Sequence, residues 1–375
     1  MVTDDRETSL AEVVPVAAQS LSRKPAAPQG GRYIPILDGW RGVAILFVLI
    51  FHGTYNTHFV PNSRMMHVSA IVGKLGILGV LIFFAISGYL ITKKLMDETP
   101  AGSPIDLRAF FIKRVFRILP PLAVYLVVLL VLSLLGFITL ARGDWSAPFF
   151  LSNYIRGTWY TSHFWSLSVE EHFYLFWPLC ILIVGWRRSF SVGIVLVVAV
   201  GVYRALTMRH FAEPVQAAGL LQHTEMRIDY IMMGCLIALA VALHPSVKRY
   251  LAWFGSSVGF VILCLLLLLL TRAVRADLRS VQALLIALLV CGSSLANATL
   301  PRLLLANPAI RFIGKISYSL YIWQQLFLQD YTNPSLQSIK VLPAKYACAF
   351  AAAMLSYYLV ERPAIKYGRR LLRRT

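Results

Sequence analysis

The chain has 375 residues, of which 58% are hydrophobic and only 14% charged, and its mean hydropathy is +0.67. This composition excludes an ordinary soluble globular protein and indicates a helical protein with many membrane spans. The formal net charge of +19 is explained by basic cytosolic loops and attraction to anionic lipid, so it is weak evidence for nucleic acid.

The first 31 residues contain several prolines and serines but no sustained apolar period. That pattern is typical of a disordered segment, and it lacks the basic start and apolar centre of a cleaved signal peptide. We therefore expect residues 1–31 to form a disordered cytosolic tail. Residues 32–367 are expected to form one membrane domain, and residues 368–375 a basic cytosolic tail.

Ten apolar segments follow the first tail and predict an all-α fold with about ten transmembrane helices. Several of them contain Gly or Ser, where helices can approach closely. The segments span residues 36–57, 75–95, 118–140, 164–185, 190–208, 227–243, 253–271, 281–298, 317–332 and 341–360.

Lysine and arginine are concentrated in alternate loops, near residues 93–117, 187–188, 248–249, 302–315 and 362–374. Short cytoplasmic loops are enriched in these residues, so both termini are expected in the cytoplasm. The sequence therefore predicts a multi-pass protein of the cytoplasmic (inner) membrane.

His52 lies inside the first apolar segment, after the charged motif Asp38-Gly-Trp-Arg41-Gly42. A helix rises 1.5 Å per residue, so His52 should lie roughly 20 Å from Asp38, beyond the middle of the bilayer core. An ionisable side chain at that depth is costly and is a candidate functional group. We expect His52 to handle a proton.

Ser87 and Gly88 interrupt the bulky residues of the second segment, which favours either a tight helix crossing or a functional hydroxyl. Arg114 and Arg117 are three residues apart and share one helix face near the cytosol. Two guanidinium groups so placed suit phosphate, although they could also be a positive-inside anchor. The prolines at 120 and 121 argue against a long regular helix through this point.

Glu170 and Glu171 lie beside aromatic residues at the outer start of the fourth segment. They could form an interfacial collar, or one of them could orient His52. Adjacent helical residues point about 100° apart, so only one can face the imidazole. We favour Glu170, which shares a face with Ser166, and place both carboxylates on the face opposite the arginines.

Two further charged motifs stand out. Arg227 and Asp229 are two residues apart and cannot face each other on a helix, so each needs a partner elsewhere. Glu361-Arg362-Pro363 is interpreted as a capped cytosolic helix end. The five cysteines are spaced for neither a metal site nor a disulfide framework, and we expect no metal.

Five motifs in chain order together resemble the acyltransferase-3 family of integral membrane acyltransferases, over about residues 33–367. They are Asp38-Gly-Trp-Arg41-Gly42 with His52, Phe83-Phe84-Ala-Ile-Ser87-Gly88-Tyr89, Arg114-Val-Phe-Arg117, Trp165-Ser-Leu-Ser-Val-Glu170-Glu171-His172-Phe-Tyr174, and Glu361-Arg362-Pro363. Many relatives carry an additional periplasmic hydrolase-like domain, and we expect none before Thr375.

The resemblance implies a ten-helix enzyme that moves an acyl group, usually acetyl, from cytosolic acyl-CoA to a hydroxyl. It implies catalytic roles for His52, Glu170 and Glu171. The residues expected to contact acyl-CoA are Arg41, Ser87, Arg114 and Arg117. His172 stands where relatives commonly carry Gln and is not counted as catalytic, and Gln324 stands where relatives often carry His.

Two mechanisms remain open at this point: direct attack assisted by His52 as general base, and a transient acyl-histidine. The alternative class is a proton-coupled membrane transporter, because transporters also place ionisable residues inside helices. The acceptor can be a sugar, cell-surface glycan, lipid or small natural product, recognised by loops 58–72, 141–163 and 209–226. The oligomeric state is open.

Overall fold

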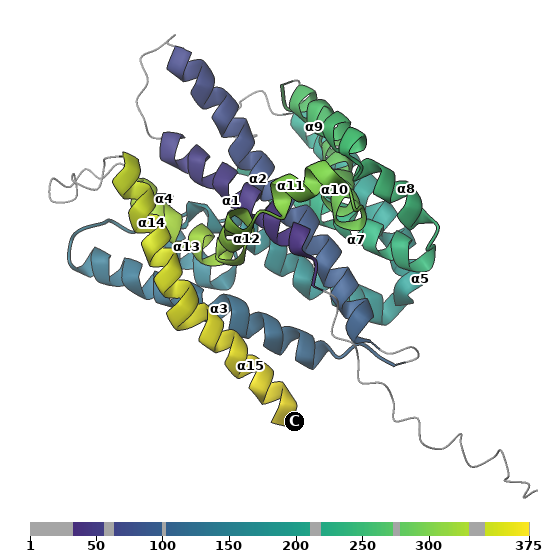
Figure 1. Cartoon of the computed structure of the whole chain (residues 1–375). Helices are drawn as coiled ribbons and strands as arrows, with labels where there is room; N and C mark the ends of the chain where they lie inside the picture. Colours follow the sequence, from purple (N-terminus) through teal and green to yellow (C-terminus); the bar gives the residue numbers. More distant parts are fainter. Residues whose placement is uncertain are drawn as a thin grey trace, which may run out of the picture.

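The computed structural model describes residues 33–55, 64–99, 103–210, 219–272, 278–329 and 342–374. These residues form helices and connecting turns without a strand, which confirms the all-α prediction (Figure 1). The expected tail at 1–31 lies outside the described residues.

The first helices are α1 (Pro35–Tyr55), α2 (Arg64–Glu98), α3 (Leu107–Leu134), the 3₁₀ segment η2 (Arg142–Phe149), α4 (Trp159–Ser162), α5 (Phe164–His210) and α7 (Thr224–Leu243).

Eight further helices and a π-helical turn complete the fold of the described residues. They are α8 (Val247–Phe254), α9 (Ser257–Arg272), α10 (Arg279–Leu295), α11 (Thr299–Leu305), α12 (Pro308–Lys315), α13 (Ser317–Leu328), α14 (Leu342–Ser356), η5 (Tyr357–Glu361) and α15 (Arg362–Arg374). Among the described residues, five helices are long and apolar enough to cross a bilayer, or seven if the bent pairs α8–α9 and α10–α11 each count as one span. These helices indicate a multi-pass membrane protein.

The centre of the bundle is built by α1, α2, α5 and α7, which pack on one another. Glycines allow α2 and α7 to touch backbone to backbone. A Cβ atom at Gly88 would lie 1.9 Å from the Ile231 carbonyl oxygen, and one at Gly234 would lie 2.3 Å from the Ala85 carbonyl oxygen. The predicted close crossing at Ser87-Gly88 is therefore confirmed, and Gly88 is the residue that makes it possible.

Helix α5 contains 47 residues, which as one straight helix would be roughly 70 Å long and more than twice the thickness of a bilayer core. Its backbone leaves the helical conformation at Gly185, where φ is 78° and ψ is 165°. Glycine adopts a positive φ without the steric cost that other residues incur. The element is therefore two helices, and they correspond to the segments predicted at 164–185 and 190–208.

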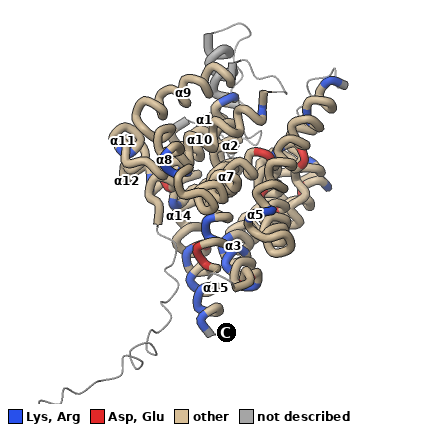
Figure 2. Tube along the Cα trace, turned by 90° about the vertical axis from the view of Figure 1, so that its right-hand side faces the viewer, with Lys and Arg blue, Asp and Glu red and all other residues tan. Residues whose placement is uncertain are grey.

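Positive charge gathers at one end of the bundle, along α15 and the first turns of α3, residues 107–117 (Figure 2). We call this the basic end. Helix α15 continues to Arg374, so the expected tail at 368–374 is helical, and it packs on α3 where a Cβ at Gly368 would lie 2.9 Å from the Phe116 ring. The last turn of α1 and the first turns of α5 and α7 lie at the other end, which we call the His52 end.

Candidate functional site

His52 lies in the last turn of α1 and faces two adjacent glutamines of α13. Its Nδ1 atom is 2.8 Å from Gln324 Oε1, and its Nε2 atom is 3.3 Å from Gln325 Nε2. The edge of the Trp159 ring closes one side, with ring centroids 5.6 Å apart. Because an amide oxygen only accepts hydrogen bonds, the contact to Gln324 places the proton of a neutral imidazole on Nδ1. Nε2 then carries the lone pair.

The glutamines are themselves fixed by the segment that leads into α5. The Trp159 indole donates to the Gln325 carbonyl at 2.9 Å, and the Gln325 side-chain oxygen accepts from the His163 amide at 3.4 Å. His163 is 2% exposed, and neither nitrogen of its ring has a hydrogen-bond partner among the described residues. We call His52, Gln324, Gln325, Trp159 and His163 the His52 chamber.

The predicted pairing of His52 with a glutamate is not what the structure contains. Glu170 instead accepts hydrogen bonds from Ser87 at 3.1 Å and from Tyr174 at 2.8 Å. Glu170 lies seven residues after His163, which is about 10 Å along the helix toward the basic end. Within the described residues, the polar contacts of the His52 ring are with amides and not with a carboxylate.

The expectation that the arginines and the glutamates occupy opposite faces is also wrong. Arg114 Nε lies 3.9 Å from Glu171 Oε1, and the Arg114 guanidinium stacks over the Tyr174 ring. At 3.9 Å the two charges attract but do not form a hydrogen bond. Neither atom has another hydrogen-bond partner in the described part of the chain. The two motifs meet because each lies about two turns inside its own helix, from opposite ends.

Arg41, Arg117 and Glu361 belong to the same charged cluster. Arg41 lies 3.7 Å from Asp38 and interacts electrostatically with Arg117, Glu170 and Glu361. Glu361 is 2% exposed and accepts a hydrogen bond from Ser319 at 2.8 Å. Glu361, interpreted from the sequence as part of a capped cytosolic helix end, is instead buried, and its carboxylate interacts electrostatically with Arg117 and Arg41. We call Arg41, Ser87, Arg114, Arg117, Glu170, Glu171 and Glu361 the arginine cluster.

A line of polar side chains connects the arginine cluster with the His52 chamber. It begins at His163, directly before α5, and continues along one face of α5 at Ser166, Glu170 and Tyr174, in steps of three or four residues. The Ser166 hydroxyl is 2.8 Å from the Tyr321 hydroxyl, which donates to the His163 carbonyl. Along α1, eleven residues separate Arg41 from His52, a distance of roughly 16 Å.

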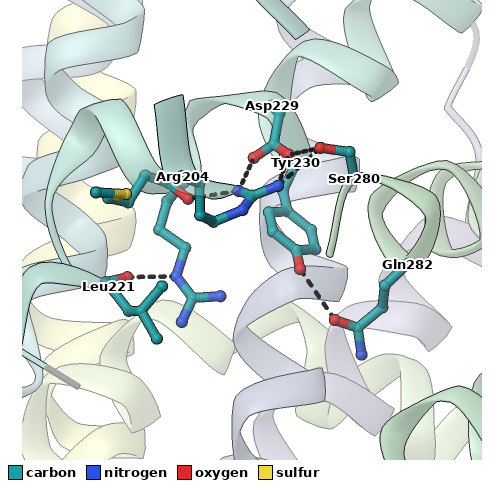
Figure 3. Close-up of polar contacts among 8 residues, drawn as sticks. Arg204, Leu221, Asp229, Tyr230, Ser280 and Gln282 are labelled. Carbon is teal, nitrogen blue, oxygen red and sulfur yellow. Dashed lines mark hydrogen bonds and ion pairs between the residues drawn. The ribbon is translucent and has the colours of Figure 1, made fainter. Parts of the chain in front are cut away.

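A second polar network lies at the His52 end between α5, α7 and α10 (Figure 3). Arg204 and Asp229 form an ion pair of 2.8 Å with both side chains fully buried. Ser280 donates to Asp229 at 2.8 Å, and the Tyr230 hydroxyl donates to Gln282 at 2.9 Å (Figure 3). The spacing of Arg227 and Asp229 predicted that each needs a partner elsewhere, and the partner of Asp229 is Arg204 of α5.

The sequence did not single out Gln324, Gln325 and His163 as members of the site. Gln324 and Gln325 lie on α13, some 270 residues after His52. Because glutamine is uncharged, it does not stand out in an apolar segment as a buried charged residue does. The only signal for His163 in the sequence was its place in the polar and aromatic run that leads to Trp165 and Ser166. His172, excluded from the catalytic set, is bound to Thr224 at 2.7 Å and lies apart from the His52 contacts.

A half-buried histidine in the last turn of an apolar helix and a partly buried arginine cluster thus lie within one multi-pass membrane protein, joined by a line of polar side chains. The acyltransferase domain family matches residues 34–362, and the chain belongs to this family. The resemblance stated from the motifs is confirmed.

Three relatives illustrate the match. The peptidoglycan O-acetyltransferase OatA of Listeria monocytogenes (serovar 1/2a, strain EGD-e) is 27% identical, covering 90% of this chain and 56% of OatA. YrhL of Bacillus subtilis (strain 168), provisionally assigned the same activity, is 30% identical over 89% of this chain and 55% of YrhL. SACOL0978 of Staphylococcus aureus (strain COL), provisionally named an O-acetyltransferase, is 27% identical over 90% of this chain and 58% of SACOL0978.

This chain therefore spans little more than half the length of these relatives. None of the solved structures gives a significant match.

Proposed function

We propose that the chain is a membrane-embedded O-acyltransferase that moves an acyl group, in the first place acetyl, from cytosolic acyl-CoA to an acceptor hydroxyl. The observation that carries this proposal is the polar line from the arginine cluster to His52 in a chain of the acyltransferase family. One end of that line suits the phosphates of a nucleotide donor. The other end holds the His52 imidazole, whose Nε2 lone pair is in contact with the Gln325 amide.

The donor is proposed to bind with its phosphates on Arg41, Arg114 and Arg117, and its long thioester arm is proposed to run along the polar line. Guanidinium groups match phosphate oxygens in geometry as well as charge. The Arg114 Nε atom is buried without a hydrogen-bond partner, so a donor oxygen would satisfy it. Ser87, Glu170, Glu171 and Glu361 then hold the arginines in place rather than contacting His52.

His52 is proposed to act as general base through Nε2. Gln324 fixes the tautomer because its side-chain oxygen accepts a hydrogen bond from Nδ1–H of His52. The acceptor hydroxyl takes the place of the Gln325 amide, which lies 3.3 Å from Nε2. The hydroxyl proton passes to Nε2 while the oxygen bonds to the thioester carbon. The carbon–sulfur bond breaks, and the departing sulfur takes the proton from His52. A transient acyl-histidine uses the same lone pair and is distinguished by trapping the acylated protein.

The topology proposed for this reaction has ten spans, cytosolic termini and a location in the cytoplasmic membrane. Division of α5 at Gly185, with the two bent pairs counted as one span each, gives eight spans, and α13 and α14 supply the last two. The basic end would face the cytosol, with cytosolic segments at 1–31 and 368–375 flanking the membrane domain at 32–367. Cysteine probes at the exposed positions Ser103 and Ala141 test this: the first should be labelled only from the cytosol and the second only from outside.

The acceptor is proposed to be a hydroxyl of a cell-surface glycan, because OatA is named for the O-acetylation of peptidoglycan. Acetyl-CoA hydrolysis and acetyl transfer to soluble glycan fragments, measured with the full chain in lipid nanodiscs, test the function. Slow hydrolysis that depends on His52 is expected. A folded protein that neither binds nor consumes acetyl-CoA would overturn the proposal and would favour a transporter.

A further inference from the structure

Arg227 is a buried arginine that forms no ion pair with a carboxylate of the described residues. It lies in the first turn of α7 and is 4% exposed. Its only hydrogen bond runs from Nε to the Leu221 carbonyl, at 2.5 Å, and its Nη1 atom is buried without a partner among the described residues. Its guanidinium faces the rings of Trp165 and Tyr230, with centroids 5.7 and 5.8 Å away.

The acidic residues nearest to Arg227 along α7 are already occupied. Asp229 binds Arg204 through both carboxylate oxygens, at 3.1 and 2.8 Å, and also accepts from Ser280 (Figure 3). Glu225 accepts from the Tyr154 hydroxyl at 2.8 Å and lies 3.2 Å from His223. Neither carboxylate is left to pair with Arg227.

The surroundings of Arg227 are positive. Arg204, Arg227 and Arg279 interact electrostatically around one carboxylate, that of Asp229, and Arg279 Nε is also buried without a partner in the described residues. A fourth arginine, Arg156, lies against the loop that Arg227 holds, since a Cβ at Gly219 would be 2.8 Å from Arg156 Nη2. A buried cation without a counter-ion costs several kcal/mol, by an order-of-magnitude estimate, so an anion bound here would be strongly favoured.

The position of Arg227 relates it to the acceptor side of the site. Trp165, which the Arg227 guanidinium faces, lies two residues after His163 and one before Ser166, both on the polar line to the His52 chamber. The His52 end lies away from the arginine cluster proposed for the donor. An anion at Arg227 is therefore placed to belong to the second substrate.

We propose that Arg227, with Arg279 close enough to interact electrostatically, binds an anionic group of the acceptor, a carboxylate or phosphate carried by a sugar. This inference rests on the proposed acyltransferase function, because it assigns the bound anion to the acceptor. A sugar held by its anionic group at Arg227 would present a hydroxyl toward His52. The chain would then select anionic over neutral glycans.

Two pairs of probes separate the carboxylate from the phosphate. The first pair is the methyl glycoside of N-acetylmuramic acid and its carboxamide, and the second is N-acetylglucosamine 1-phosphate and methyl N-acetylglucosaminide. Affinities are measured by calorimetry on the full chain in nanodiscs. Wild-type protein should bind at least one anionic probe roughly ten- to hundredfold more tightly than its neutral partner, as expected of hydrogen bonds to a charged group.

Arg227→Gln should abolish that preference without weakening binding of the neutral probe. Arg227→Lys, which keeps the charge, should retain part of it and decides the question if the Gln variant does not fold. The matched control is Arg302→Gln, which removes an exposed arginine of α11, outside the loops assigned to the acceptor, and should leave the preference unchanged.

Wild-type protein that shows no preference in either pair, or an Arg227→Gln variant that keeps the preference, would overturn the inference. The pair that shows the preference identifies the anionic group. Consumption of acetyl-CoA is measured separately on wild-type protein, so its failure would count against the proposed function and not against the anion site.

Discussion

The Arg204–Asp229 network is fully buried and the arginine cluster is partly buried, and they differ in pairing: we call the network closed because its carboxylate and terminal guanidinium atoms are hydrogen-bonded, and the cluster open. In the network both Asp229 oxygens and both terminal guanidinium nitrogens of Arg204 form hydrogen bonds, and Ser280 and a backbone carbonyl are further partners, so that among the described residues only Arg204 Nε is left without one. In the cluster the nearest pair, Arg114 and Glu171, stops at 3.9 Å and leaves both atoms without partners among the described residues. We infer that charges paired at hydrogen-bonding distance, such as Arg204 and Asp229, stabilise the fold. Charges that are close but not hydrogen-bonded, such as Arg114 and Glu171, indicate where a ligand could bind.

The largest effect is expected from His52→Ala. Loss of a general base lowers the rate of acetyl transfer by roughly 10²–10⁴-fold. Expression and thermal stability should stay near wild type, because the ring contacts only amides and aromatic edges. The check is the transfer rate at saturating acetyl-CoA, with the melting temperature of each preparation. Near-normal turnover in the variant would place the base elsewhere.

The closed network should respond to mutation through stability. Asp229→Ala leaves Arg204 buried without its partner, and such a loss costs about 3–5 kcal/mol. Glu171→Gln, in the open cluster, is the matched comparison and should change stability far less. Unfolding in mixed micelles measures both. Equal losses in the two variants would mean that the arginine cluster is structural as well.

A smaller effect is expected from Gln324→Ala, which removes the acceptor for the His52 Nδ1 proton. One neutral hydrogen bond is worth about 1 kcal/mol, so the transfer rate should fall roughly fivefold. Gln324→Glu should keep the rate and move its pH dependence to higher pH, because an anion beside the imidazole stabilises the protonated ring. An unchanged rate profile in both variants would exclude Gln324 from positioning the base.

Much of the fold was predictable because apolar length and Gly placement act locally. Each of the ten predicted segments overlaps a helix, one part of α5 or a bent pair within the described residues, and Gly88 and Gly185 explain a close crossing and a break in α5. The partners within the site were not predictable. Glu361 and Gln324 come to Arg41 and His52 from the far end of the chain, and no local pattern encodes which helices adjoin. Motif spacing identified His52 and Arg114, but it could not show that Glu170 faces Ser87.

The most direct test is calorimetric titration of acetyl-CoA into two variants in nanodiscs, His52→Ala and the double variant Arg114→Ala/Arg117→Ala. We expect near-wild-type affinity for acetyl-CoA in His52→Ala and a loss of at least tenfold in the double variant. The reason is that the donor phosphates bind at one end of the polar line and the general base lies at the other. Unchanged donor affinity in the double variant, or a comparable loss in His52→Ala, would contradict that division.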